Sequence, residues 1–588
     1  MKTSFDFKIL SVFLLPSLGF LIDLIIRFSF LSGMKIGLVP GYLVSFIFEL
    51  AIFYFVFLLL KALNSKIATF LISLIFTIIQ LVCFGHYFYY GAIPNSFSID
   101  FTFSDFKYAG IVIVGSLSWI DVVAIFALAI AYSFAINFLL GFVKKTHKLV
   151  SVSAIVLFSL SALILNSNVK KHPGNFGVIS NTFFTSGYVI KNRLLHEPAD
   201  YKPDYVRREV KVRERIKTKP KYNVVFVLSE SVRQKSIHYY GYQRDNSPFL
   251  DSLVKNKKVI PFTRHFSNTN ITRFSVPYIM SGAITKLNNP KSVFISDYLK
   301  NWLDINTYYY SAQSYKGFRQ YFDTNTDEFL ELGNSGLLRY NDNGFNDHDL
   351  VSRFDQLTGR FDSSRNFYCL LQFNNTHAPY KCEKEFEIFN PASSKPVNAY
   401  DNSILEQDFL LRQIFSVLNK RDLLKSTIVI FTSDHGECFK EHGHYGHLNC
   451  LYNEETLVPM WIYVPQSFDS ITRNMLVENS SKSTSHLDIL PTILDFCGVN
   501  DTLMLTNKIQ GNSLLRSIPP DRIIPMYGFS IQISKALVFE NHKLIIKDGE
   551  PNRLFDETTD YNEKHNLWQG LPESDKTRYL NLVGKYLK

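Results

Sequence analysis

Five apolar stretches of membrane-spanning length open the chain and limit what its first part can fold into. They cover residues 10–31, 41–60, 67–90, 119–142 and 149–167. About 20 apolar helical residues cross a bilayer core, so each stretch is long enough to span once. Residues 1–168 hold only 16 Asp, Glu, Lys or Arg side chains. One such stretch could be a buried helix of a globular domain, but five in succession predict an α-helical transmembrane domain over 1–168.

Lysines are unevenly distributed among the segments that join these stretches. The lysine-rich segments are 1–8, 61–66 and 144–148. The intervening segments 32–40 and 92–118 hold one lysine each. Because positively charged segments remain in the cytoplasm, the N-terminus is expected inside and residues 168–588 outside. This pattern predicts a multi-pass membrane protein whose C-terminal part faces the exterior.

Two further parts follow the apolar region. Residues 169–221 are rich in Pro, Asn and Lys and are interpreted as a linker, with membrane-surface helices expected around 176–195. Residues 222–588 have ordinary globular polarity. The formal net charge of +10 does not indicate nucleic-acid binding, because a domain outside the cytoplasm does not meet DNA. A basic surface beside a bilayer is expected to meet anionic lipid or glycolipid instead.

Short apolar runs rich in β-branched and aromatic residues begin at residue 222. Five of them cover 223–228, 305–312, 366–373, 426–433 and 458–465. Helically spaced segments, 400–419 and 486–497, lie between and after these runs, and 536–549 has the pattern of a hairpin. Continuous apolar runs are typical of strands buried on both faces. We therefore expect an α/β domain with a central, mostly parallel sheet.

Side chains with metal-binding chemistry stand where two of these runs end. Glu230 follows the run at 223–228, and Asp434-His435 follows the run at 426–433. Since ligands bind at the carboxyl ends of strands in open α/β sheets, we expect these residues in one crevice. Two carboxylates, an imidazole and the hydroxyl of Thr272 suit a divalent metal that activates an oxygen nucleophile. The residues thus predict a metal-dependent enzyme acting on phosphate.

Six short motifs follow one another in an order that resembles a known family. They are SESVR at 229–233, GYQRDNSPFL at 241–250, TRFSVP at 272–277, NNTHAPY at 374–380, YDNSILEQD at 400–408 and SDHGE…EHGHYGH at 433–447. With the five spans and the linker, the whole plan resembles the membrane-anchored phosphoethanolamine transferases of the alkaline phosphatase/sulfatase superfamily. The resemblance implies an alkaline phosphatase/sulfatase-like catalytic domain and a phosphoethanolamine transferase-like phosphotransferase. It also implies a place in the bacterial inner (cell) membrane, with the catalytic domain facing the periplasm or exterior.

The resemblance also implies roles for individual residues. The implied metal ligands are Glu230, Thr272, Asp434 and His435. Zinc is the implied metal, although manganese would accept the same ligands, and a second metal is left open. Thr272 is the implied nucleophile, and its other interpretation is a cap of the following helix. His377 and His447 are implied to act in catalysis and to handle the substrate phosphate or a second metal.

Two further residues match the family's substrate contacts. Lys316, in SYKGF, matches a lysine that contacts the phosphate. Asn95 matches the first position of a donor-binding Asn-x3-Thr-x3-Glu pattern, but Ile99 stands where the threonine is expected. The transferred group is therefore less firmly implied than the metal chemistry. A cysteine-bridged frame around the nucleophile is also missing, and Cys438 with Cys450 is considered as a disulfide.

The implied function is transfer of phosphoethanolamine from a phospholipid donor to lipid A, a core sugar or another glycan through a phosphothreonine intermediate. Phosphoglycerol transfer is the alternative within the same chemistry. The other alternative is a hydrolase of the sulfatase or phosphodiesterase type. Formylglycine sulfatases need Cys/Ser-x-Pro-x-Arg, and the segment from Ser275 to Ile279 has isoleucine in place of the arginine.

Ionisable residues lie within the first two apolar stretches. Asp23 precedes Arg27 by four residues, and Glu49 lies within the second stretch. Such groups are costly in a bilayer and face protein or water. A path for a lipid headgroup and an intramembrane structural pair are equally compatible with the sequence.

Overall fold

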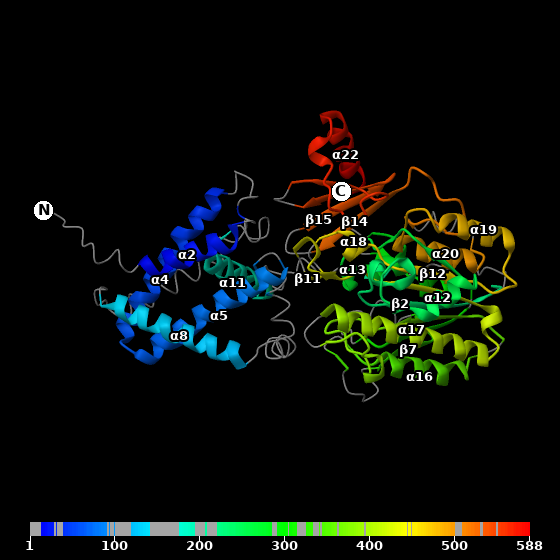
Figure 1. Ribbon diagram of the computed structural model, residues 1–588, viewed down its shortest axis with the longest axis horizontal. Coiled ribbons are helices and arrows are strands. Elements are labelled where there is room, and N and C mark those ends of the chain that lie inside the picture. The colour runs from blue at the N-terminus through cyan, green and yellow to red at the C-terminus, as the bar shows by residue number, and fades with distance from the viewer. Residues whose placement is uncertain are drawn as a thin grey trace. The chain divides into compact units, whose positions relative to one another are not determined.

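The computed structural model of the chain is shown in Figure 1. It describes residues 13–28, 31, 39–90, 93–94, 99, 119–141, 176–194, 206–207, 220–284, 291–303, 305–313, 325–332, 340–341, 344–361, 364–392, 396–443, 445–447, 450–499, 509–529, 533–547 and 551–587. The chain forms two compact units, one of residues 1–202 with 547–551 and one of residues 203–546 with 552–588. The finer division at residues 168 and 221 stays a prediction.

The first unit is a bundle of apolar helices. Its helices are α2 (Leu14–Ile26), α4 (Val39–Leu63), α5 (Lys66–Tyr90), α8 (Trp119–Leu140) and α11 (Val178–Leu194). Within the described part, three segments are long and apolar enough to cross a membrane: Val39–Leu63, Lys66–Tyr87 and Val122–Leu140. Helix α2 is shorter than the predicted stretch at 10–31, and the stretch at 149–167 lies outside the described residues. The count of five spans therefore stays a prediction.

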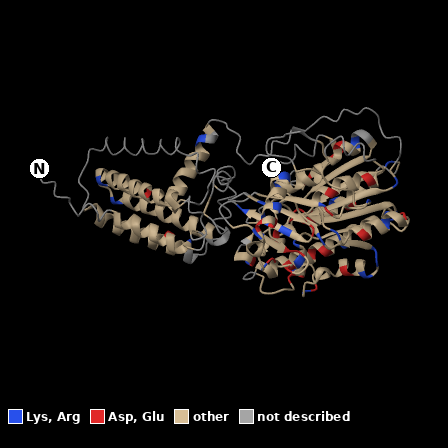
Figure 2. Ribbon diagram, turned by 90° about the horizontal axis from the view of Figure 1, so that it is seen from above, with Lys and Arg blue, Asp and Glu red and all other residues tan. Residues whose placement is uncertain are grey.

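Charged residues are sparse on these helices (Figure 2), and two of them pair inside the bundle. Arg27 donates from Nε to Asp23 Oδ1 at 2.5 Å and from Nη2 to Asp23 Oδ2 at 2.7 Å. Tyr42 donates its hydroxyl to Asp23 Oδ2 at 2.9 Å. Both carboxylate oxygens of Asp23 are thus bound by donors of the chain itself, which supports the structural interpretation of this pair.

Helix α11 is held by Glu49 of α4. Oε1 of Glu49 accepts the backbone N–H groups of Ile179 and Ser180, each at 3.1 Å. These N–H groups belong to the first turn of α11 and have no partner within the helix, so the carboxylate caps them and complements the helix dipole. The segment expected to form surface helices at 176–195 is accordingly one helix packed on α4 and α5.

A seven-stranded sheet forms the centre of the second unit, in the order β3-β12-β9-β2-β8-β6-β7. Its strands are β2 (Asn223–Ser229), β3 (Val259–Phe262), β6 (Asn306–Ser311), β7 (Glu328–Glu331), β8 (Phe367–Gln372), β9 (Thr427–Ser433) and β12 (Met460–Tyr463). β9, β2, β8, β6 and β7 pair in parallel, whereas β12 runs antiparallel to β9 and β3. The sheet is therefore mixed, and each of the five predicted runs contains one of its strands.

Helices cover both faces of this sheet (Figure 1). One face packs against α12 (Pro248–Lys255), α16 (Asp347–Thr358) and α17 (Pro396–Lys420), and the other against α13 (Thr272–Ser281), α14 (Ile295–Tyr298) and α20 (Ile489–Phe496). Because side chains alternate along a strand, Val225 and Val227 of β2 enter the first core. Val224, Phe226 and Leu228 enter the second. Burial on both faces explains why β2 is apolar from Val224 to Leu228.

A second, four-stranded sheet follows near the C-terminus, in the order β14-β15-β16-β17. Its strands are β14 (Ile523–Phe529), β15 (Ile533–Phe539), β16 (His542–Lys547) and β17 (Arg553–Asp556), and α22 (Glu573–Tyr586) packs on them. The predicted hairpin is confirmed as the neighbouring strands β15 and β16. The short elements are β1 (Val206–Arg207), β4 (His265–Phe266), β5 (Lys291–Ser292), β10 (Cys438–Phe439), β11 (Tyr445–Gly446), α18 (Asn453–Thr456), α19 (Ser470–Asn479) and β13 (Thr484–Ser485).

Candidate active site

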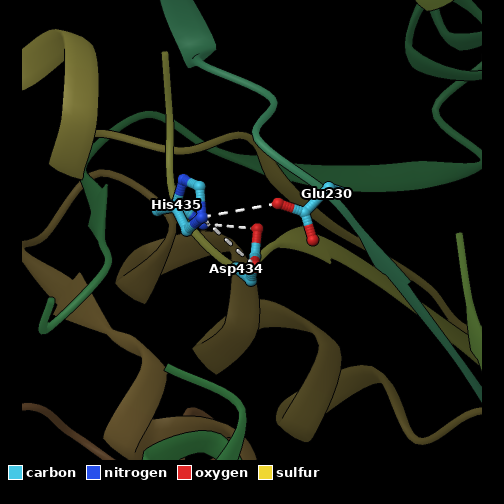
Figure 3. A group of neighbouring side chains, drawn as sticks. All are labelled: Glu230, Asp434 and His435. Carbon is cyan, nitrogen blue, oxygen red and sulfur yellow. Dashed lines mark hydrogen bonds and ion pairs between the residues drawn. The ribbon is translucent and has the colours of Figure 1, made fainter. Parts of the chain in front are cut away.

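The carboxyl ends of β2 and β9 lie side by side and place two acidic residues together. The two strands are parallel neighbours, and Ser229 at the end of β2 pairs with Ser433 at the end of β9. The next residue along each strand is Glu230 or Asp434, and both side chains are buried. Figure 3 shows these carboxylates facing the imidazole of His435. Ligand atoms of the three residues all lie within 4.8 Å of one another.

The imidazole of His435 presents one nitrogen to the two carboxylates. Nε2 lies 3.4 Å from Glu230 Oε1 and 3.5 Å from Asp434 Oδ2. Nδ1 lies 2.9 Å from the carbonyl oxygen of Gly436, which can only accept, so Nδ1 carries the proton and donates. In the neutral ring, Nε2 then holds the lone pair. A nitrogen lone pair between two carboxylates is a suitable ligand for a cation.

Thr272 is the first residue of α13 and turns its hydroxyl toward this group. Oγ1 lies 3.2 Å from Glu230 Oε1 and 3.1 Å from His435 Nε2. The capping position is occupied by Ile271, whose backbone is extended, and no side-chain cap is formed. The interpretation of Thr272 as a helix cap is therefore wrong. Its place at the N-terminus of a ten-residue helix puts the hydroxyl where the helix dipole favours negative charge.

The arrangement fits a divalent cation. Asp434 Oδ1 accepts backbone N–H groups from Ser231 at 3.0 Å and His435 at 2.8 Å, whereas the buried Oδ2 has no hydrogen-bond partner among the described residues. Burial, together with the facing charge of Asp434, raises the pKa of Glu230 to about 7. An orphaned buried oxygen and two opposed carboxylates are costly without a cation. Oxygen and imidazole donors of this kind suit zinc or manganese.

Ser231 braces both carboxylates from a left-handed backbone conformation with φ of 56°. Its N–H binds Asp434, and its hydroxyl donates to Glu230 Oε1 at 2.8 Å. Such a φ is unfavourable for a residue with a Cβ and is kept only where the surroundings enforce it. Tyr400 of α17 does so by donating its hydroxyl to the carbonyl of Ser231 at 2.7 Å. A residue of the YDNSILEQD motif thereby stabilises the backbone conformation of the SESVR motif.

The structure also brings His377 and His447 to this region. The rings of His447 and His435 are 4.2 Å apart between centroids, and those of His377 and His447 are 6.3 Å apart. His377 donates from Nδ1 to the carbonyl of Ala378 at 2.8 Å. The two predicted histidines therefore lie beside the three clustered ligands, and their roles stay proposals.

The sequence-based prediction missed three residues that organise the site: Ser231, Gln313 and Glu437. Glu437 is buried, lies 3.2 Å from Nδ1 of His447 through Oε1, and accepts the hydroxyl of Tyr380 at 3.0 Å through Oε2. Burial alone would raise the pKa of Glu437, but the nearby histidines, His447 first, lower it. The motif SDHGE contained this residue, and its spacing three residues after Asp434 was the available signal.

Two predicted substrate residues are not placed. Lys316 and Asn95 lie outside the described residues, so their roles stay predictions. The disulfide considered between Cys438 and Cys450 is absent, since both are free thiols.

Comparison with known proteins agrees with this geometry. The Sulfatase family model matches residues 222–499. Endo-4-O-sulfatase of Bacteroides thetaiotaomicron is 25% identical over 173 residues, which are 26% of this chain and 32% of that protein. Arylsulfatase K of Bos taurus is 31% identical over 186 residues, 29% of this chain and 32% of that protein. Phosphoethanolamine transferase EptA of Helicobacter pylori is 24% identical over 296 residues, 46% of this chain and 54% of that protein.

The chain thus spans about a third to a half of the length of these curated relatives. Among solved structures, the integral membrane protein lipooligosaccharide phosphoethanolamine transferase A of Neisseria meningitidis matches with a TM-score of 0.52 at 17% identity, covering 77% of this chain and 88% of that chain. At this identity the likeness concerns the fold. Residues 222–499 thus match the Sulfatase family, and the chain is similar in sequence to EptA of Helicobacter pylori and in fold to the Neisseria meningitidis transferase.

Proposed function

We propose that this protein transfers phosphoethanolamine from a phospholipid to an outer-surface acceptor such as lipid A, a core sugar or another glycan. The group passes through a phosphothreonine at Thr272. The observation that carries the proposal is the Thr272 hydroxyl, held between Glu230 and His435 beside an orphaned carboxylate oxygen. The apolar helices of the first unit support a donor drawn from the membrane, because they keep the catalytic unit at a lipid surface.

The chain's own residues account for the positioning of the first step. Glu230 and His435 hold Thr272 Oγ1 at the N-terminus of α13, where it attacks the phosphorus in line with the leaving alcohol. The bond from phosphorus to the diacylglycerol oxygen breaks as the bond to Oγ1 forms. His377 or His447 then protonates the leaving alkoxide, a task that suits imidazole near neutral pH. An acceptor hydroxyl or phosphate then attacks the phosphorus in a second in-line step, in which the bond to Oγ1 breaks and Thr272 regains its hydroxyl proton.

A divalent cation would be held by Glu230, Thr272, Asp434 and His435. When bound, it would supply the positive charge that lowers the pKa of the threonine hydroxyl and offsets the charge of the phosphoryl oxygens. We propose zinc, and manganese is the alternative for the same donors.

A sulfatase-type hydrolase is the second candidate, because the matched family model and several relatives are sulfatases. A sulfatase nucleophile in the pattern Cys/Ser-x-Pro-x-Arg would be Ser275. The buried hydroxyl of Ser275 instead donates to the main-chain oxygen of Asp434 at 2.6 Å and lies 3.2 Å from His486 Nδ1. These contacts favour Thr272 as the nucleophile.

Thr272→Ala tests the nucleophile. We expect the full-length variant, in vesicles containing phosphatidylethanolamine, to lose transfer by at least about a thousandfold, since no other hydroxyl replaces Oγ1. Thr272→Ser keeps a hydroxyl and should keep measurable activity. Mass spectrometry of the Thr272 peptide and of the acceptor lipids identifies the group carried: phosphoethanolamine supports the proposal, phosphoglycerol supports the alternative transferase, and release of free headgroup alone indicates a hydrolase. Undiminished turnover of Thr272→Ala would refute the phosphothreonine.

A further inference from the structure

A buried side-chain amide binds one oxygen of Glu230 from behind. Gln313 Nε2 donates to Glu230 Oε2 at 2.7 Å and to the carbonyl of Phe373 at 2.7 Å. Both residues of the first bond are buried, so it is shielded from water. A backbone carbonyl can only accept, so the contact to Phe373 determines which end of the amide faces Glu230.

A second glutamine fixes the orientation of the Gln313 amide. Gln372, the last residue of β8, donates from Nε2 to Gln313 Oε1 at 3.0 Å. Its own carbonyl oxygen accepts the hydroxyl groups of Tyr309 and Ser311. Each amide oxygen is therefore bound by a donor, and each amide nitrogen points toward the site. The chain of hydrogen bonds runs in one direction, from the strands β6 and β8 to the carboxylate of Glu230.

Sheet register explains why these residues meet. Ser311 of β6 pairs with Gln372 of β8, and Leu228 of β2 pairs with Gln372 across its other edge. Gln313 follows the end of β6, so three adjacent parallel strands deliver Gln313, Gln372 and Glu230 to the same edge of the sheet. The network is thus part of the sheet's carboxyl edge.

The consequence concerns which oxygens of the cluster remain for a cation. Gln313 binds Oε2 of Glu230, while backbone N–H groups bind Oδ1 of Asp434. The oxygens nearest His435 Nε2 are the other two, Glu230 Oε1 and Asp434 Oδ2. Of these, Oε1 also accepts the hydroxyl of Ser231 at 2.8 Å, which leaves its second lone pair for a cation. An amide bound at Oε2 disfavours both rotation of the carboxylate and its use of both oxygens on one cation.

We propose that Gln313 is a positioning residue that orients Glu230 for metal binding through Oε1 alone, with Gln372 holding Gln313 in the required orientation. This inference rests on the metal site of the proposed function. Groups that orient metal ligands typically change metal affinity by about 10- to 100-fold when they are removed. The role of Gln313 is therefore measurable as zinc affinity, without reference to catalysis.

The experiment is a zinc titration of the metal-free, full-length protein in detergent, in competition with a chelator of known affinity. Gln313→Leu removes the amide, and we expect zinc to bind about tenfold or more weakly. Asn479→Leu is the matched control, because Asn479 is also a buried amide that donates to two backbone carbonyls, those of Leu514 and Arg516, away from the site. Its zinc affinity should stay within about twofold of the native value.

The outcomes separate the two proposals. Native protein that binds no zinc contradicts the metal site itself. Native protein that binds zinc, with Gln313→Leu folded and binding it equally well, overturns the positioning role. If Gln313→Leu does not fold, Gln372→Leu decides, since it leaves Gln313 in place but removes the donor that orients it. We expect Gln372→Leu to weaken zinc binding by roughly two- to fivefold, a smaller change than removal of the direct contact. An unchanged affinity would overturn the proposal.

Discussion

Buried carboxylates occur in both units of the protein, but they are neutralised in opposite ways. In the first unit, which contains the apolar helices and is called the membrane unit below, Asp23 receives three hydrogen bonds from Arg27 and Tyr42. Both of its oxygens are therefore bound within the chain. In the second unit, which holds the candidate active site, Glu230 and Asp434 face one another, and Asp434 Oδ2 has no hydrogen-bond partner in the part of the chain that the structure describes. The first cluster is electrostatically complete, whereas the second is complete only with a cation.

The comparison shows what separates structural from functional buried charges, since both kinds are buried. In the second unit, Lys543 and Glu563 also form a buried ion pair, with Nζ 3.1 Å from Oε1. Burial therefore does not by itself identify the active site. The distinguishing observation is a set of like charges whose ligand atoms converge and whose hydrogen bonds leave one side open.

Asp434→Asn should produce the largest effect, and it tests the incomplete cluster. We expect zinc affinity to fall by roughly a thousandfold, because a charged ligand is lost from a site whose total binding energy is of order 10 kcal/mol. The metal-free variant should be at least as stable as the metal-free native protein, since the amide removes repulsion with Glu230. Thermal unfolding with chelator and with zinc measures both. A metal-free variant that melts well below the native protein would contradict the comparison.

Asp23→Asn tests the complete cluster and should act in the opposite sense. It leaves the buried guanidinium of Arg27 without its counter-charge, which costs about 3–5 kcal/mol for a buried pair. We expect the membrane unit to be destabilised to the same extent with and without zinc, as measured by thermal unfolding in detergent. Asp23→Asn/Arg27→Met removes both charges and should recover part of the loss. A double variant less stable than Asp23→Asn would show that the pair is not the cause.

A smaller, pH-dependent effect on the stability of the folded protein is expected at His442. Its Nδ1 lies 2.6 Å from Glu454 Oε1 and its Nε2 lies 3.1 Å from the carbonyl of Glu563. Burial alone would lower the pKa of His442, but Glu454 raises it above its usual value. The folded state then binds the proton more tightly than the unfolded chain, so the stabilisation is complete below about pH 6.5 and is lost as the pH rises through the folded-state pKa.

His442→Gln should therefore lower the melting temperature by about 1–2 °C at pH 6 and by less at pH 9, since roughly 1 kcal/mol corresponds to a small shift in a domain of this size. Thermal unfolding across this pH range measures the difference. In a Glu454→Gln background the pH dependence should disappear. A melting-temperature difference that grows with pH would contradict the sign derived from the pKa shift.

The candidate site was predictable where the chemistry follows a strand directly. Glu230 and Asp434 stand immediately after long apolar runs, and the rule that parallel strands deliver ligands at one edge was enough to group them. Thr272 belonged to the same prediction, although its position as the first residue of α13 was not part of it. The strands themselves were recognisable because burial on both faces keeps most of their positions apolar or aromatic.

Gln313, Ser231 and Glu437 were not predictable in the same way. A glutamine two residues after a strand is unremarkable in sequence, and its role depends on the register that places Ser311 opposite Gln372. Ser231 acquires its role from a backbone conformation enforced by Tyr400, 169 residues away. Interactions of this kind are set by packing between distant segments, which local patterns do not encode.

The sequence alone determined which segments are apolar enough for a membrane, which runs form buried strands, and which residue types can bind a cation, because these properties follow from composition and periodicity. Only the tertiary structure decided that α11 docks on Glu49, that the central sheet is mixed, and that hydrogen bonds within the chain hold Oδ1 of Asp434 and both oxygens of Glu230. Those outcomes depend on strand register and on differences of a few tenths of an ångström in the distances between groups far apart in the chain. Such distances arise only when all the packed elements are in place.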